Sequence, residues 1–311
     1  MRSAIGIDIG GTKVAGLRVA EDGSVLERRE RPTPADDVPA TVETVAGLAA
    51  ELAEGGGEAV GVGAAGMVEF AAGTLRYAPN LAWREVPLRD LVSERTGLPC
   101  VVDNDANVAA WAEYRFGAAR GFRHVLLITV GTGIGGGIVA DGALFRGAHG
   151  FAAEIGHIIV EPDGPPCGCG NRGCWEQVAS GRALDRLARA EVERDPSGRI
   201  AALAAGDEVS GRHVSEAARE GDPAAVAAFA TVGRRLGEGI AGLVNVLDPE
   251  VVVVGGGVAE EGAVLLDPAR AAFVEAVEAP EHRPEVPIVP AALGNDAGAI
   301  GAAALALGLP A

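Results

Sequence analysis

The sequence is poor in aromatic residues and almost without lysine. Only 4% of its 311 residues are aromatic, so the hydrophobic core must consist mainly of aliphatic side chains. One lysine, Lys13, stands among 26 basic residues, and the formal net charge is −17. No block of Lys and Arg interrupts this acidity. Because nucleic acids attract proteins through basic surfaces, the composition argues against a nucleic-acid partner.

Long hydrophobic runs are also missing. The longest apolar stretches, around residues 251–254 and 302–309, fall far short of the roughly 20 residues that a membrane span requires. The first strand-like segment begins at Ala4, without the basic region, apolar core and cleavage site of a signal peptide before it. We therefore expect a soluble, cytoplasmic protein with no membrane partner.

Cysteine is scarce, but three of the four cysteines lie close together, as Cys167, Cys169 and Cys174. Three thiolates and the imidazole of His157 supply the tetrahedral ligand set that structural zinc prefers. In a chain expected to stay in a reducing compartment, this spacing favours metal binding over a disulfide. Three reduced cysteines in a glycine-rich loop are the alternative. Cys100, in a strand-like segment, is expected in the core.

A pattern of three short strands occurs twice. Alternating residues and glycine turns predict strands at 4–9, 14–19 and 24–30, and again at 125–130, 134–139 and 143–146. Amphipathic stretches at 42–52, 106–116 and 224–247 predict helices, and short apolar runs at 60–63 and 251–254 predict buried strands. Alternating strands and helices favour α/β lobes. We expect a small lobe over residues 1–115, with a C-terminal helix at 297–311 packing on it, and a large lobe over 116–296 that carries a zinc loop at 157–176.

The first glycine turn reads Asp8-Ile9-Gly10-Gly11-Thr12-Lys13. It combines a carboxylate, two residues that let backbone N–H groups approach an anion, a hydroxyl and an ammonium. These groups favour a phosphate site beside a metal-binding carboxylate. The alternative is an ordinary hairpin turn, in which two adjacent glycines are common. A Walker A loop is excluded because Thr12 and Lys13 stand in reversed order and a strand follows. The solitary Lys13 supports phosphate contact, since every other basic residue is arginine.

Two further glycine runs follow predicted strands. Gly131-Thr132-Gly133-Ile134-Gly135-Gly136 fits a dinucleotide-binding pattern, but it leads into a hairpin where such a site needs a helix. A second phosphate-facing turn suits the sequence better. Gly255-Gly256-Gly257 is expected to let an adenine or ribose approach the backbone. An ordinary strand-to-helix loop would give the same glycines.

Several carboxylates flank these motifs. Asp103-Asn104-Asp105 ends a strand and precedes a helix, where Asp or Asn usually caps the helix. Either aspartate is able to cap, which leaves the other as a hydroxyl-activating base at the carboxyl end of a strand. Glu154 shares a helical turn with His157, and Glu176 follows the last cysteine of the cluster. A zinc ion bound by His157 and the cysteines would orient these polar side chains. The alternative is that both glutamates are solvated surface residues.

Three stretches resemble the ROK family (repressors, open reading frames and kinases), and within it the bacterial glucokinases. They are residues 8–13, residues 127–157 and residues 167–176. The resemblance covers essentially the whole chain. It implies an α/β fold with two lobes and a cleft between them, the actin-like or hexokinase-like duplication of a ribonuclease H-like unit. A homo-oligomer, dimer or tetramer, is expected.

The resemblance also implies roles for individual residues. Asp105 would be the catalytic base. The sugar would be held by Asn104, Asp105, Glu154, His157 and Glu176. From the glycine turns themselves, and not from the resemblance, we expect ATP with Mg²⁺ to be bound by Asp8, Gly10, Gly11, Thr12, Lys13, Thr132, Gly133, Gly255 and Gly256. Structural Zn²⁺ would be bound by His157, Cys167, Cys169 and Cys174.

The expected reaction is transfer of the γ-phosphate of ATP to the 6-hydroxyl of glucose, giving glucose 6-phosphate. Alternatives are a kinase for another hexose or an N-acetylhexosamine, and polyphosphate as the donor. A sugar-responsive repressor of the same family needs a DNA-binding module, for which the segment before residue 4 leaves no room. A further alternative is an actin-like ATPase that has no sugar substrate. That function would not explain the zinc loop and the carboxylates beside it.

Overall fold

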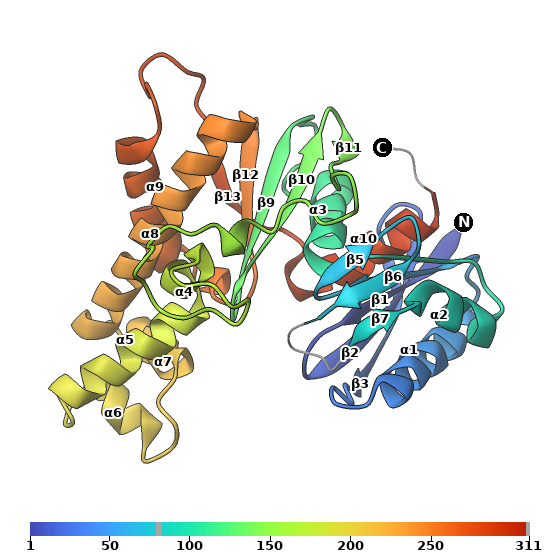
Figure 1. The fold of residues 1–311 in the computed structure, drawn as a ribbon, viewed down its shortest axis with the longest axis horizontal. Helices are drawn as coiled ribbons and strands as arrows, with labels where there is room; N and C mark the ends of the chain where they lie inside the picture. Colours follow the sequence, from blue (N-terminus) through green and yellow to red (C-terminus); the bar gives the residue numbers. More distant parts are fainter. Residues whose placement is uncertain (79–82, 309–311) are drawn as a thin grey trace. The chain divides into compact units, whose positions relative to one another are not determined.

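A computed structural model describes residues 1–78 and 83–308 of the protein, and the strands form three sheets (Figure 1). The first five-stranded sheet has the order β3-β2-β1-β4-β8, with β1 Ser3–Ile9, β2 Lys13–Ala20, β3 Val25–Pro32, β4 Val60–Ala64 and β8 Cys100–Asn104. The second has the order β11-β10-β9-β12-β13, with β9 Val125–Val130, β10 Ile134–Ala140, β11 Ala143–Leu144, β12 Val251–Gly255 and β13 Ile288–Pro290. The third is a small sheet of β5 Met67–Glu69, β6 Thr74–Tyr77 and β7 Arg84–Val86.

The two larger sheets share one topology. In chain order, each places its first three strands as a meander and adds the next two strands beyond the first. The pairs β1–β4, β4–β8 and β12–β13 are parallel, whereas β1–β2 and β2–β3 are antiparallel. The repeated three-strand pattern predicted from the sequence is therefore confirmed as a structural duplication.

The helices agree with the amphipathic stretches. Those at 42–52, 106–116 and 224–247 correspond to α1 Val38–Ala53, α3 Asp105–Phe116 and α8 Pro223–Leu247. The remaining helices are α2 Leu88–Thr96, α4 Trp175–Ala179, α5 Gly181–Arg194, α6 Arg199–Ala204, α7 Gly211–Arg219, α9 Ala263–Ala276 and α10 Ala297–Ala306, with short 3₁₀ turns η1 Ile155–His157, η2 Ala259–Glu261 and η3 Gly294–Asp296. No helix in the described part of the chain is both long and apolar enough to cross a membrane.

The chain forms two compact units. The first contains residues 1–127, 136–153 and 291–311, and the second contains residues 128–135 and 154–290. The helix expected at 297–311 is α10, which belongs to the first unit, while residues 309–311 lie outside the described residues. The lobe boundary between residues 115 and 116 stays a prediction.

In the first unit, helices cover both faces of the sheet. Side chains alternate along a strand, so Ile5, Ile7 and Ile9 of β1 enter a core shared with α1, whereas Gly6 faces the other side. There α10 lies so close that a Cβ on Gly6 would stand 1.8 Å from the Ala299 carbonyl oxygen. The glycine therefore serves helix-on-sheet packing.

Replacing Gly6 with alanine should lower the free energy of unfolding by about 3 kcal/mol, because neither backbone is able to retreat from the added methyl group. Urea unfolding measures this loss. The matched control is Gly47→Ala on the exposed face of α1, where no atom lies within 4 Å of the added Cβ. That change should instead stabilise by about 0.5–1 kcal/mol. Equal shifts for the two variants would contradict the packing argument.

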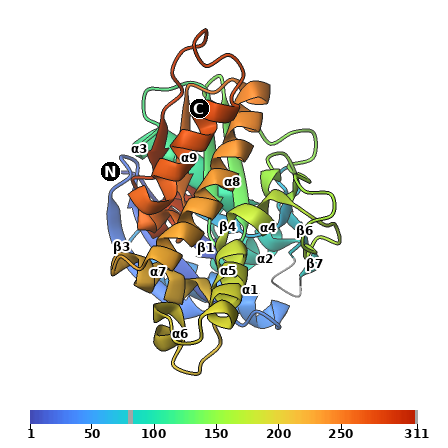
Figure 2. The ribbon, with the colours of Figure 1, turned by 90° about the vertical axis from the view of Figure 1, so that its left-hand side faces the viewer.

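In the second unit, α8 and α9 lie side by side, as both ribbon views show (Figures 1 and 2). Small residues make this close approach possible. A Cβ on Gly233 or Gly237 of α8 would come within 2.5 Å or 2.1 Å of a carbonyl oxygen of α9. The helix pair forms a rigid support for the loops described below.

Candidate active site

Asp8 occupies the β1 face that α10 covers. Position 298, in the first turn of α10, has no room for a side chain, because a Cβ there would stand 2.8 Å from Asp8 Cγ. The carboxylate thus lies against the start of a helix, where the helix dipole favours negative charge. Burial and the charge of Asp105 raise the pKa of Asp8 to about 7, and the charge of Lys13 opposes this shift. Two carboxylates and one ammonium therefore share a small region of the first unit.

The turn after Asp8 is open on its glycine side. Gly10 N–H donates to the Lys13 carbonyl oxygen at 2.9 Å, which closes the turn between β1 and β2. A Cβ on Gly11 would meet nothing within 4 Å, and neither Gly10 nor Gly11 has a positive φ. Neither protein packing nor backbone conformation therefore explains Gly11. Lys13 Nζ lies 2.9 Å from Glu30 Oε1 and is exposed.

The segment 103–105 distributes its roles differently from the sequence-based expectation. Asn104, not an aspartate, caps α3, because its Oδ1 accepts from Ala106 N and Asn107 N at 2.9 and 3.1 Å. Its Nδ2 donates to Gly66 O at 3.1 Å. The expectation that Asp103 or Asp105 caps the helix is wrong, since the middle residue has the better reach to the second and third N–H groups.

Asp103 is a structural carboxylate. It is 1% exposed, and its Oδ1 accepts from Asn104 N and Asn107 Nδ2 at 2.8 and 3.0 Å. Its Oδ2 accepts from Arg146 Nε at 2.7 Å. Both oxygens are thus fully engaged, which leaves Asp105 as the carboxylate available for chemistry.

Asp105 begins α3. One oxygen, Oδ1, accepts from Ala106 N at 2.9 Å. Burial raises the pKa of Asp105, while hydrogen bonds from Ala106 and Asn104 oppose the shift. A carboxylate with a raised pKa is a stronger proton acceptor, which is the property expected of a general base.

In the second unit, the turn at Gly131–Gly133 contacts Glu176. Gly131 N–H donates to the Gly133 carbonyl oxygen at 3.0 Å. A Cβ on Gly133 would stand 2.3 Å from Glu176 Oε2, so the carboxylate packs directly on the turn. As at Gly11, a Cβ on Gly131 would meet nothing within 4 Å. A predicted phosphate turn and a predicted sugar ligand are therefore neighbours in this unit.

The predicted zinc ligands come together. One ligand atom from each of His157, Cys167, Cys169 and Cys174 lies within 4.8 Å of all the others. Cys167 Sγ is 3.6 Å from His157 Nδ1, and Cys169 Sγ is 3.6 Å from Cys174 Sγ. Zn–S bonds of about 2.3 Å in a tetrahedron separate two sulfur atoms by about 3.8 Å. The four residues therefore fit a closed zinc site.

The zinc cluster also contacts the sugar-binding candidates. Cys167 Sγ lies 3.2 Å from Glu176 Oε1. Glu154 and His157 flank the 3₁₀ turn η1, in which His157 N donates to Glu154 O at 3.1 Å. The helical turn predicted for this pair is confirmed. Metal binding would therefore fix three predicted sugar ligands together.

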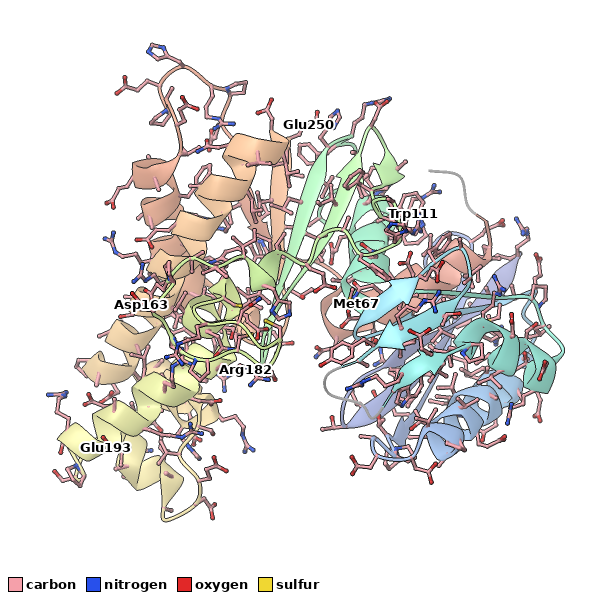
Figure 3. All side chains as sticks on the ribbon, viewed as in Figure 1. Met67, Trp111, Asp163, Arg182, Glu193 and Glu250 are labelled. Carbon is pink, nitrogen blue, oxygen red and sulfur yellow. The ribbon has the colours of Figure 1, made fainter. Side chains whose placement is uncertain are left out.

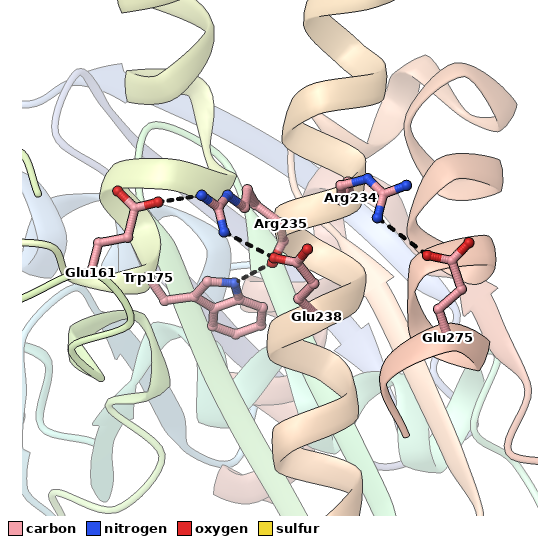
Figure 4. Close-up of polar contacts among 6 residues, drawn as sticks. All are labelled: Glu161, Trp175, Arg234, Arg235, Glu238 and Glu275. Carbon is pink, nitrogen blue, oxygen red and sulfur yellow. Dashed lines mark hydrogen bonds and ion pairs between the residues drawn. The ribbon is translucent and has the colours of Figure 1, made fainter. Parts of the chain in front are cut away.

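The long helix α8 anchors the zinc loop (Figure 4). Trp175, which follows the last cysteine, donates from Nε1 to Arg235 O at 2.9 Å, and Arg235 pairs with Glu161 and Glu238. Arg234 pairs with Glu275 of α9 at 3.2 Å. A Cβ on Gly239 would stand 2.1 Å from the Trp175 ring, so this glycine makes room for the indole.

The third glycine run has a structural explanation in part. Gly255 ends β12. Gly256 has φ +89°, and a Cβ there would stand 2.6 Å from Val130 O, so its conformation and its packing both require glycine. A Cβ on Gly257 would meet nothing within 4 Å. Packing therefore requires glycine at position 256 and does not explain the glycine at position 257.

Sequence reasoning missed Arg146, Thr33 and Ser180. Arg146 binds Asp103 and places its guanidinium 3.9 Å from the centre of the Phe70 ring. Thr33 binds the first glycine turn, and Ser180 binds the second. Of these three residues, only Ser180 could have been found from its local sequence, because a serine before a helical stretch is a typical N-cap.

Comparisons with known proteins identify the family of the chain. The chain matches the ROK family over residues 4–308. It is 46% identical over 312 residues to a glucokinase of Streptomyces coelicolor and 38% identical over 306 residues to a glucokinase of Thermotoga maritima, with at least 96% of each chain covered.

Among solved structures, it is similar to a ROK family glucokinase from Streptomyces griseus in complex with glucose and AMPPNP. The TM-score is 0.90 and the identity 48%, over 98% of this chain and 99% of that one. The predicted α/β fold of the actin-like, hexokinase-like class is confirmed. The chain belongs to the ROK family.

Proposed function

We propose that the protein is a glucokinase, which transfers the γ-phosphate of ATP to the 6-hydroxyl of glucose. The observation that carries the proposal is the environment of Asp105. Its neighbours Asp103 and Asn104 are committed to an ion pair and a helix cap, whereas Asp105 has a raised pKa at the end of a parallel strand. The similarity to glucokinases over nearly the full length supports glucose as the acceptor.

Phosphoryl transfer asks a protein mainly to position the reactants and to balance charge. The open turns at Gly10–Lys13 and Gly131–Gly133 supply backbone N–H groups for the triphosphate. Asp8 would hold Mg²⁺, which neutralises the phosphate oxygens when bound. Asp105 accepts the proton of the sugar hydroxyl as the oxygen attacks phosphorus.

The sugar is held by Asn104, Glu154, His157 and Glu176 in this proposal. The contacts of Cys167 with His157 and Glu176 support a structural role for zinc, which orders these ligands and takes no part in the chemical step. The cluster of thiols suits the reducing cytoplasm.

A coupled assay of ADP release across glucose, mannose, fructose, allose and N-acetylmannosamine tests the function, with ATP and polyphosphate as donors. We expect the highest kcat/KM for glucose with ATP. A higher kcat/KM for another sugar would replace glucose as the substrate. Absence of sugar-dependent ADP release would contradict the kinase itself.

Lys13→Arg should raise the KM for ATP or lower kcat by about tenfold, although the charge is kept. A planar guanidinium does not match the compact ammonium beside two glycines. Steady-state kinetics with varied ATP measure this effect. The control is Arg31→Lys, which alters another exposed cation of the same meander, paired with Glu51. Unchanged kinetics of Lys13→Arg would show that the solitary lysine has no special role.

A further inference from the structure

The carbonyl oxygens of the first phosphate turn are bound from outside by Thr33, which directly follows β3. Thr33 Oγ1 donates to Gly10 O at 2.8 Å, and Thr33 N donates to Thr12 O at 3.0 Å. Within residues 1–78 and 83–308, no hydrogen bond is recorded for the N–H groups of Gly11 and Thr12. Two carbonyl oxygens of the turn, those of Gly10 and Thr12, are thus occupied, whereas these two N–H donors are available.

The second phosphate turn is bound by Ser180, the N-cap of α5, whose side chain is fully buried. Its hydroxyl lies 2.9 Å from Thr132 O and 2.5 Å from Glu176 O, and donates its single hydrogen toward these two carbonyls. One side chain therefore joins the turn to the helix that carries a predicted sugar ligand.

The start of α5 completes this arrangement. Gly181 N donates to Gly131 O at 2.8 Å, and Arg182, labelled in Figure 3, donates from its backbone N–H to Thr132 O at 3.3 Å. The first N–H groups of a helix normally lack a partner within the helix. Here those of Gly181 and Arg182 donate to carbonyl oxygens of the turn. Among the residues that the structure describes, the N–H groups of Thr132 and Gly133 have no recorded partner.

We propose that Thr33 and Ser180 are positioning residues for the ATP triphosphate, each holding a carbonyl of its glycine turn away from the phosphates. The inference rests on the proposed function. Glycine-rich turns change peptide orientation easily, because glycine has few forbidden conformations. A reversed peptide would direct a carbonyl oxygen at the phosphate and withdraw an N–H donor. The two turns stand at equivalent places in the duplicated sheets, yet different elements hold them, the residue after β3 in one case and the start of α5 in the other.

The test compares Thr33→Val and Ser180→Ala, which remove the hydroxyls, with matched controls elsewhere. Thr44→Val removes a hydroxyl that binds Ala40 O inside α1, and Ser210→Ala removes the N-cap of α7. Each test variant should raise both the KM for ATP and the Kd of a non-hydrolysable ATP analogue about fivefold or more. For Thr33→Val the KM for glucose should change by less than about twofold, since the lost hydrogen bond acts on the turn alone. Ser180→Ala also loses the contact with Glu176 O, so this variant is judged by its nucleotide affinity.

Thr33→Ser and Ser180→Thr keep the hydroxyl and should restore nucleotide affinity. Test variants that lose only thermal stability, as the controls do, would overturn the proposal. If Ser180→Ala fails to fold, the half-buried Thr33 decides the question alone. A wild-type protein that does not phosphorylate glucose would refute the proposed function. The Kd of the ATP analogue for the Thr33 and Ser180 variants would still test the role of the two hydroxyls.

Discussion

Replacing Asp105 with asparagine should lower kcat by about 10²- to 10⁴-fold, the usual contribution of a general base. The amide keeps the size and the hydrogen-bonding ability of the carboxylate, but it does not accept the hydroxyl proton. The Kd for glucose, measured by calorimetry, should stay within about threefold of the wild-type value. A kcat within tenfold of wild type would exclude Asp105 as the base.

The thermal stability of the same variant gives a second readout. Because burial raises the pKa of Asp105, the charged form is less favourable in the folded protein than in the unfolded chain. The native state therefore loses stability from this group as the pH rises above its ordinary pKa. Removing the charge should leave the melting temperature at neutral pH unchanged or higher.

Asp103→Asn is the matched control. It makes the same chemical change two residues away, but we expect it to affect the melting temperature more than kcat. It weakens the bond with Arg146 at a position that is 1% exposed, so the melting temperature should fall. Its kcat should fall far less than that of Asp105→Asn. If Asp103→Asn instead lost kcat and Asp105→Asn lost stability, Asp103 would be the base and Asp105 the structural carboxylate.

Cys169→Ser should reduce bound zinc from one equivalent to less than about half, lower the melting temperature and lower kcat/KM for glucose by about tenfold to a hundredfold. Structural zinc contributes to folding directly, so a lost ligand loosens the loop. A small misplacement of Glu176 and His157, which contact Cys167, is sufficient for such a kinetic loss.

Elemental analysis of protein purified without chelators measures the metal. Cys100→Ala is the control, since Cys100 is buried in β8 and burial raises the pKa of its thiol to about 12. Its zinc content should equal that of the wild type. Less than about half an equivalent of zinc in the wild type, or three readily titratable thiols, would contradict a closed site.

The larger strands were predictable because their determinants are local. Alternation of apolar residues and glycine turns places the strands of the first meander within two residues of β1, β2 and β3. The third predicted strand of the second meander, at 143–146, ends earlier, because Arg146 turns away to bind Asp103. The small sheet β5-β6-β7 escaped prediction, since strands of three or four residues are too short for a visible period.

The residues of the zinc cluster were predictable, whereas the contacts around the other candidate residues were not. The zinc ligands follow from chemistry and spacing alone, and they do come together. The division of roles among Asp103, Asn104 and Asp105 depends on Arg146, which lies 43 residues beyond Asp103 in the chain. Such long-range partners have no local pattern. The same holds for Thr33, whose function depends on a turn in another strand pair.

The dependence of β1 on α10 has a consequence for the order of folding. The sheet of the first unit closes only when residues near Ala299 and Ala302 pack on Gly6 and Gly61, and these helix residues leave the ribosome almost 300 residues after β1. Domains usually fold as they are synthesised, beginning with the N-terminal one. Here the nearly continuous stretch 154–290 has its own core available earlier. The face of β1 that carries Gly6 therefore waits for the last helix, and a chaperone would find that face uncovered through most of translation.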